Sequence, residues 1–163
     1  MAQKSKALVS LRLENRGTLA EMTVAATPER VWRVLNSFEE MPAYLSGLTQ
    51  SRILKKDGAY RLVEQTAMTE IAFLPISFRV VLDVVEDRPF LYFKQRNGTF
   101  TSFRGHWRVD RVSVGTGSRV LYYLEASLGQ GLKQRAFERQ LQRMIRQNMQ
   151  ELAGWIDNSG VSK

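Results

Sequence analysis

Apolar and polar residues recur with two different periods along this chain, and the last change of period comes near Gly131. Before that point the chain contains short alternating runs, as in residues 101–111, where Phe103, Trp107 and Val109 share one face. Alternation of this kind predicts β-strands with one buried and one solvated side. After Gly131, apolar residues return at three- and four-residue spacing, which predicts an amphipathic helix of 26 residues, 132–157.

The strand-like runs are separated by short turn signals. Asp57-Gly58 and Asn97-Gly98 are typical of tight hairpins, and Leu74-Pro75 is expected to break the chain between two strands. Connections this short imply that successive strands are antiparallel neighbours. The predicted strands cover residues 7–13, 18–25, 48–55, 59–67, 76–86, 90–95, 101–111 and 119–126.

Two short helices are predicted between the second and third of these strands. Thr27 is a good N-cap and Pro28 suits the first helical position, so a helix should begin here. Ser37 and Glu40 have the spacing of a capping box and predict a second helix start. Pro42 should keep this second element short and bent. The first helix would span residues 27–36, and the second would end near residue 45 or 47.

These elements predict an α+β fold in which the long helix packs on a curved antiparallel sheet. A chain of 163 residues is long enough for one domain with a sizeable core. The sheet would contain about six to seven strands and would wrap around the helix, leaving an apolar cavity between them. We assign residues 18–157 to this domain, residues 1–17 to an N-terminal extension with a strand-like run, and residues 158–163 to a tail.

The composition excludes several kinds of site and compartment. The chain has no cysteine and one histidine, His106, which falls on the polar face of its strand. Disulfides, a zinc site and a Ser-His-Asp triad are therefore not expected, and we assign no catalytic residue, metal or cofactor. Because no apolar run reaches about 18 residues and none follows the basic N-terminus, we expect a cytoplasmic protein with neither a membrane span nor a secretory signal.

The net charge of +8 favours an anionic partner, such as RNA or an acidic membrane surface to which the protein would bind peripherally. Basic residues are spread along the chain, however, so solubility is the simpler explanation of the charge. The most suggestive pattern is a basic stripe on the long helix, which we interpret as a solvated face. It consists of Lys133, Arg135, Arg139, Arg143 and Arg146, with Gln150.

Four segments carry a family resemblance. Residues 24–35 read VAATPERVWRVL and are followed by SFEEMPAYL at 37–45. Further along, FRGHWRV at 103–109 precedes a Gly-rich turn and RVLYYL at 119–124. Together they resemble the START-like helix-grip (SRPBCC) superfamily, which includes plant pollen allergens and polyketide cyclases. The likeness extends over residues 18–157, and it is greatest to the polyketide cyclase/dehydrase and coenzyme-Q-binding branch.

The resemblance implies that the cavity between the sheet and the long helix holds a hydrophobic ligand. Tyr44 is expected near its entrance, and the helix methionines would adapt to an irregular ligand. The expected ligand contacts are Phe78, Val80, Leu82, Leu91, Phe93, Phe103, Trp107, Tyr122 and Leu124 from the strands, and Leu141, Met144, Ile145 and Met149 from the helix.

Members of this superfamily bind lipids, isoprenoid quinones, hormones or polyketides, and some bacterial relatives associate with the ribosome. We favour a carrier or chaperone for a lipid, an isoprenoid quinone or a polyketide-like compound. A ribosome- or RNA-associated regulator is a further alternative, supported by the basic charge but not by any aromatic and basic strand face. The sequence does not indicate the oligomeric state.

The enzymatic alternative is a polyketide cyclase. Aldol cyclisation needs little more than a shaped pocket, an acid–base group and an oxyanion donor. Alternation puts Glu64 and Gln65 on opposite faces of their strand and leaves open which of them is inside. The candidate groups for this chemistry are Arg61, Glu64, Gln65, Tyr122 and Tyr123.

Overall fold

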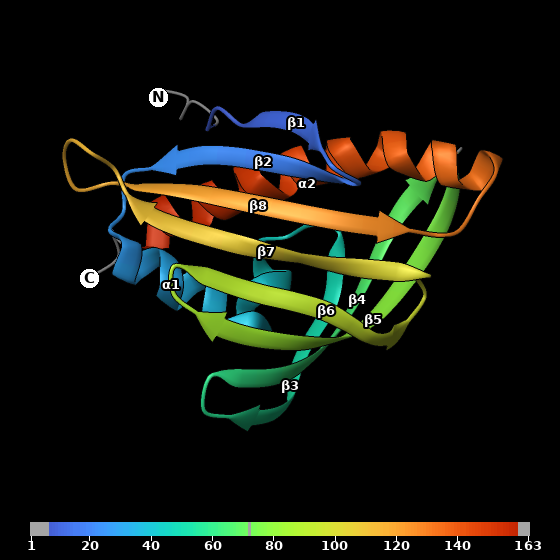
Figure 1. Cartoon of the computed structure of the whole chain (residues 1–163), viewed down its shortest axis with the longest axis horizontal. Coiled ribbons are helices and arrows are strands. Elements are labelled where there is room, and N and C mark those ends of the chain that lie inside the picture. Colours follow the sequence, from blue (N-terminus) through green and yellow to red (C-terminus); the bar gives the residue numbers. More distant parts are fainter. Residues whose placement is uncertain (1–6, 72, 160–163) are drawn as a thin grey trace.

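The change of period near Gly131 is the boundary between sheet and helix in the folded chain. The computed structural model describes residues 7–71 and 73–159. Within these residues the alternating runs form one eight-stranded antiparallel sheet, in the order β1-β2-β8-β7-β6-β5-β4-β3 (Figure 1). The strands are β1 (Ser10–Glu14), β2 (Gly17–Val24), β3 (Leu48–Asp57), β4 (Tyr60–Ile71), β5 (Leu74–Asp87), β6 (Phe90–Gly98), β7 (Ser102–Arg111) and β8 (Ser118–Ser127).

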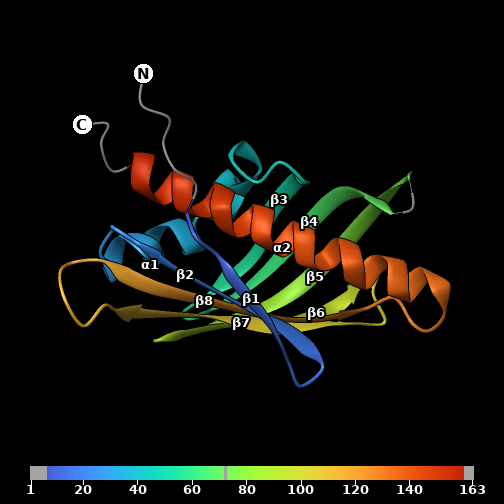
Figure 2. The same cartoon turned by 90° about the horizontal axis from the view of Figure 1, so that it is seen from above.

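The long helix α2, Leu132–Ser159, lies across the concave side of this sheet (Figure 2). It begins where predicted and is two residues longer, 28 in place of 26. No helix in the described part of the chain is both long enough and apolar enough to cross a membrane. The predicted apolar face of α2 is turned to the core through Phe137, Leu141, Ile145, Met149, Leu152, Ala153 and Ile156, all of which are buried.

The first short helix, α1 (Pro28–Asn36), begins as predicted. The side-chain oxygen of Thr27 accepts a hydrogen bond from the backbone N–H of Arg30 at 3.4 Å, which satisfies one of the free donors of the first turn. The buried residues of this helix face the core, and they are Val31, Trp32, Val34 and Leu35.

The second short element is a 3-10 helix, η1 (Phe38–Ala43), and the predicted capping box is wrong. Ser37 also ends α1, and its hydroxyl donates to the backbone carbonyl of Arg33 at 2.8 Å. The last carbonyls of a helix lack partners within the helix, so this serine serves the end of α1 and leaves η1 without a side-chain cap.

The predicted N-terminal extension contributes an edge strand, so the sheet has eight strands where about six to seven were predicted. β1 pairs with β2 from Ser10 opposite Glu21 to Glu14 opposite Gly17. The guanidinium of Arg146 on α2 also donates to the backbone carbonyl of Val9 at 2.6 Å. Residues 1–6 of the predicted extension and residues 160–163 of the predicted tail lie outside the described residues.

The predicted break at Leu74-Pro75 is also wrong. β4 and β5 form one long hairpin in which Glu70 pairs with Pro75 and Ile71 pairs with Leu74. Pairing of β5 with β6 extends only as far as Val80 opposite Gly98. Pro75 therefore lies where β5 has a neighbour on one side alone, a position in which a sheet tolerates a residue without an N–H group.

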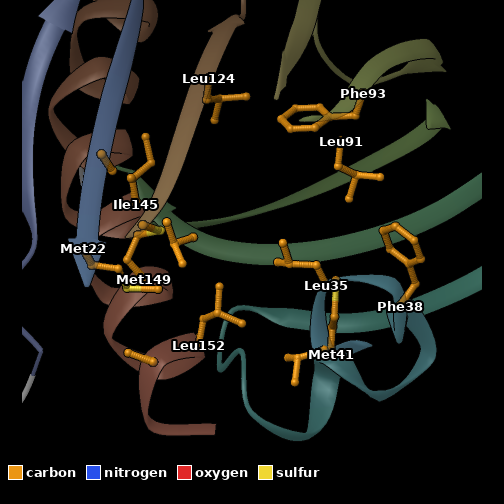
Figure 3. Close-up of a cluster of buried hydrophobic side chains, with 14 of the residues drawn as sticks. Met22, Leu35, Phe38, Met41, Leu91, Phe93, Leu124, Ile145, Met149 and Leu152 are labelled. Carbon is orange, nitrogen blue, oxygen red and sulfur yellow. The ribbon is translucent and has the colours of Figure 1, made fainter. Parts of the chain in front are cut away.

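The core lies where the sheet, α2 and the two short helices meet. Figure 3 shows side chains from α1, η1, β6, β8 and α2 turned toward one shared interior. The labelled members of this cluster are Met22, Leu35, Phe38, Met41, Leu91, Phe93, Leu124, Ile145, Met149 and Leu152.

Replacing Ile156 tests the docking of the last turns of α2. Ile156 is fully buried, and its backbone carbonyl accepts a hydrogen bond from Arg30 of α1 at 3.0 Å. Ile156→Ala should lower the free energy of unfolding by about 2–5 kcal/mol, measured by denaturant titration. The control Val114→Ala, at a side chain that is 87% exposed, should change it by less than about 0.5 kcal/mol. Equal effects of the two substitutions would contradict this packing.

Candidate functional site

The concave face of the sheet and the apolar face of α2 enclose a cavity of about 410 Å³. Its walls come from residues of β3 to β8, from α1 and η1, and from α2. All the residues that the resemblance led us to expect as ligand contacts line it: Phe78, Val80, Leu82, Leu91, Phe93, Phe103, Trp107, Tyr122, Leu124, Leu141, Met144, Ile145 and Met149.

Aromatic rings form a continuous part of the sheet wall. Tyr122 packs against Trp107 with ring centroids 4.3 Å apart and stacks on Phe93 at 5.8 Å. Phe100 extends this wall, with centroids 4.9 Å from Phe103 and 5.0 Å from Phe78. Such rings have few rotatable bonds, whereas Met144 and Met149 on the helix side are flexible and polarizable. The cavity thus combines one stiff wall with one adaptable wall.

The end of the cavity near the N-terminal helices was not predicted. Phe38 and Met41 of η1 line it together with Leu35 of α1. Residues three apart share one side of a 3-10 helix. If the sequence had been interpreted as a 3-10 helix here, the spacing of Phe38 and Met41 would have placed both side chains on the side that faces the cavity. The other unpredicted apolar or small lining residues are Leu45, Gly47, Leu48, Ala67, Met68, Val84, Phe100, Phe137 and Leu152.

Gln65, and not Glu64, faces the cavity. The amide of Gln65 donates to the hydroxyl of Ser51 at 3.0 Å and lies 3.5 Å from the sulfur of Met41. Glu64 points to the other side of β4, where it forms ion pairs with Arg52 and Arg79. Hydrogen bonds from these two guanidinium groups lower the pKa of the Glu64 carboxyl, which keeps it charged and outside the cavity.

Two tyrosines, Tyr44 and Tyr122, are among the residues that line the cavity. Burial raises the pKa of Tyr122 far above its usual value, and burial, with a smaller contribution from Glu40, does the same for Tyr44. Both phenols therefore stay protonated and can donate hydrogen bonds. Tyr44 stacks on Trp155 at 5.0 Å, and its buried hydroxyl has no hydrogen-bond partner among the described residues.

The other groups considered for cyclase chemistry lie elsewhere. Tyr123 points away from the cavity, and its hydroxyl donates to the backbone carbonyl of Glu14 at 3.3 Å. Arg61 is not among the lining residues, although one of its guanidinium nitrogens is buried without a partner within the described part of the chain. Of the candidate cyclase groups, the cavity therefore contains only Gln65 and Tyr122.

The cavity reaches the surface between α2 and the region where η1 leads into β3. Ser46, Met68, Gln147 and Asn148 line the cavity and are also solvent-exposed, so they mark its mouth. The amide of Gln147 donates to the Ser46 hydroxyl at 2.9 Å, and both carboxylate oxygens of Glu151 lie 3.3 Å from the Ser46 backbone N–H. Tyr44, expected near the entrance, lines the cavity two residues from Ser46.

His106 lies on the convex side of the sheet, as its place on the polar face predicted. Its ring lies 5.4 Å from the rings of Phe90 and Tyr123 and 6.0 Å from that of Tyr92. This packing buries the imidazole in part, which lowers the pKa of His106. Among the described residues, His, Asp and Glu side chains form no cluster of three that could hold a metal ion.

A match over most of the sequence identifies the family. A model of the family described as polyketide cyclase / dehydrase and lipid transport matches residues 24–153. The chain belongs to this family. The match runs from the end of β2 into the last turns of α2, so it includes most of the cavity walls just described. No curated protein matches the sequence significantly.

Solved structures show the START helix-grip fold of this family. The Zhui aromatase/cyclase from Streptomyces sp. R1128 superposes with a TM-score of 0.77 at 14% identity, covering 90% of this chain and 96% of that one. A START superfamily protein from Mycobacterium smegmatis gives 0.75 at 13% identity, covering 89% and 99%. Human StAR-related lipid transfer protein 5 gives 0.71 at 11% identity, covering 99% and 86%. At these identities the likeness is one of fold.

Removing the Tyr44 hydroxyl should stabilise the ligand-free protein. A buried hydroxyl without a partner costs about 1–3 kcal/mol, and Tyr44→Phe removes it while keeping the ring on Trp155. We expect the free energy of unfolding to rise by about 1 kcal/mol in a denaturant titration of delipidated protein. Tyr123→Phe, which removes a hydroxyl with a partner on the convex side, should not raise it. A loss of stability in Tyr44→Phe would show that the hydroxyl is satisfied.

Proposed function

We propose that the protein binds a neutral, hydrophobic small molecule in this cavity and acts as its carrier or chaperone. The observation that supports this most directly is the chemistry of the lining: none of the described residues around the cavity carries a charge. A buried charge on the ligand would therefore find no partner, and burying an unpaired charge is costly. The volume of about 410 Å³ also falls within the roughly 300–1,000 Å³ typical of small-molecule sites.

The lining also restricts the shape and polarity of the ligand. Apolar surface buried against the aromatic wall and the helix methionines would supply most of the affinity, at about 25 cal/mol for each Å². Oxygen atoms on the ligand could accept hydrogen bonds from Tyr44 and Tyr122. A lipid, an isoprenoid quinone or a polyketide-like compound has this combination of an apolar body and a few carbonyl or hydroxyl oxygens. A cytoplasmic location is part of the same proposal.

Polyketide cyclisation is the second candidate, because Tyr122 and Gln65 both face the cavity and the Zhui aromatase/cyclase shares the fold. Aldol chemistry needs a group that accepts a proton. Tyr122 is kept protonated by burial, Gln65 is an amide, and Glu64 points outward in ion pairs. These contacts favour binding over catalysis.

Filling the cavity tests the binding site. Ala67 lines the cavity, so Ala67→Phe would place a ring in existing empty space. We expect organic extracts of the purified parent protein to contain a prenylated, acylated or polyketide-like compound, and extracts of Ala67→Phe to contain at least about tenfold less. Titration with a fluorescent diacylglycerol and with a short-chain quinone, both uncharged, should show the same loss of affinity.

The matched control is Ala59→Phe, the same substitution in the exposed turn between β3 and β4. It should retain the ligand, and both variants should unfold at temperatures close to the parent's. An empty parent extract, with no uptake of either probe, would overturn the proposal. Conversion of a linear poly-β-ketone by the parent but not by Tyr122→Phe would favour the cyclase.

Tyr44→Phe separates ligand recognition from stability. If the ligand accepts a hydrogen bond from the Tyr44 hydroxyl, its loss should weaken binding about 3- to 12-fold, the equivalent of about 0.5–1.5 kcal/mol. The same substitution is expected to stabilise the ligand-free protein, so the two effects have opposite directions. Affinity measured by calorimetry with the extracted compound checks this, and unchanged affinity would show that the ligand makes no bond to Tyr44.

A further inference from the structure

Arginines on the convex side of the sheet are neutralised by carboxylates. Glu64 lies between Arg52 and Arg79, and Arg96 pairs with Asp83 at 2.7 Å. Two further pairs repeat this arrangement on other strands, Arg104 with Glu125 at 2.9 Å and Arg119 with Glu21 at 2.8 Å. The convex face therefore carries many arginines but little unbalanced charge.

The basic stripe of α2 differs from that face. Arg135, Arg139 and Arg143 are exposed, and their side chains form no ion pair or hydrogen bond within residues 7–71 and 73–159. Like charges spaced four residues apart destabilise a helix. Repulsion among these arginines lowers the stability of the helix. An anionic partner bound on this face would offset that repulsion.

Apolar side chains lie beside the N-terminal half of this stripe. The hydroxyl of Thr69 on β4 accepts a hydrogen bond from the amide of Gln140 at 3.1 Å, so the β4–β5 hairpin is held against α2. At the end of the hairpin, Phe73 and Leu74 are 94% and 63% exposed. Both views show the end of β4 and the start of β5 on the side of the molecule where the first turns of α2 lie (Figures 1 and 2). Exposed large apolar residues next to unpaired cations are typical of a docking surface.

We propose that this docking surface, formed by Arg135, Arg139, Arg143, Phe73 and Leu74, binds a bilayer containing anionic phospholipids. The guanidinium groups would contact the headgroup phosphates, since arginine binds phosphate through paired N–H donors. Phe73 and Leu74 would enter the headgroup and acyl boundary. A phosphodiester backbone such as that of RNA would match the arginines but would leave these two apolar side chains in water.

The mouth of the cavity opens beside the same face. Gln147, which lines the cavity at its mouth, also lines a surface hollow together with Arg139 and Arg143. A protein docked through the stripe would present this opening to the lipid surface, so that a hydrophobic ligand could enter or leave with little exposure to water. The docking surface is separate from the proposed ligand site and can bind vesicles whether or not the cavity is filled.

The test is sedimentation of the full chain with two kinds of vesicle, one of phosphatidylcholine alone and one of phosphatidylcholine with about 30% phosphatidylglycerol. The second composition supplies the anionic surface that attracts clusters of basic residues. We expect binding to the anionic vesicles only, weakening with added salt. Each arginine near an anionic surface contributes about fivefold, so Arg139→Gln with Arg143→Gln should weaken binding about 25-fold. Phe73→Ser with Leu74→Ser should also weaken it.

The matched control is Arg104→Gln with Arg119→Gln, which lowers the net charge from +8 to +6 just as the stripe variant does, but on the convex face. Full vesicle binding by this control and weak binding by the stripe variant support the docking surface. Equal losses in the two variants would overturn it, as would binding to single-stranded RNA but not to vesicles.

The two proposals can fail separately. Ala67→Phe should lose the ligand and keep vesicle binding, since Ala67 lines the cavity and is not part of the docking surface. A parent protein that binds its ligand but no anionic vesicle would overturn the docking surface and leave the ligand site standing.

Discussion

The burial of one face of α2 against the concave side of the sheet is the contact on which the rest of this structure depends. The helix closes the cavity, anchors the edge strand through Arg146 and Val9, and meets α1 through Ile156 and Arg30. Because Met149 and Ile156 are fully buried while the arginines of the opposite side are exposed, the same helix separates an apolar interior from a charged surface. The proposed ligand site and the proposed docking surface are two sides of one element.

How much of this could be predicted from the sequence depended on the range of the interactions. The alternation of residues 101–111 and the helical spacing after Gly131 follow from local geometry, so the inward faces of β5 to β8 and of α2 were predicted correctly. The resemblance supplied the arrangement of these faces around a cavity. β1 was assigned to an extension because the resemblance begins at residue 18. Few of its side chains are covered in the sheet, so its own sequence gives little indication of its place there.

The errors have local physical causes. Ser37 has the residue type and spacing of a helix cap, but it serves the end of α1, which precedes it. Proline is a residue that usually ends a strand, yet Pro75 lies within β5 at a position with only one neighbouring strand. Whether Glu64 or Gln65 faces the cavity could be decided only from the register of β4. Alternation with a period of two allows either face of a strand to be the buried one until its pairing is known. The place of Phe38 and Met41 in the cavity wall could be predicted only from the three-residue period of a 3-10 helix.

The strand order has a consequence for how the chain folds. β2 pairs with β8, so Thr18 lies opposite Leu124, and the sheet is complete only when strands more than one hundred residues apart have met. Contacts between such distant residues slow folding. During synthesis β8 and α2 emerge last, and until α2 docks, the aromatic wall of the future cavity faces water. A newly made chain therefore passes through a stage with a large open apolar surface, the kind of surface that chaperones bind and that promotes aggregation.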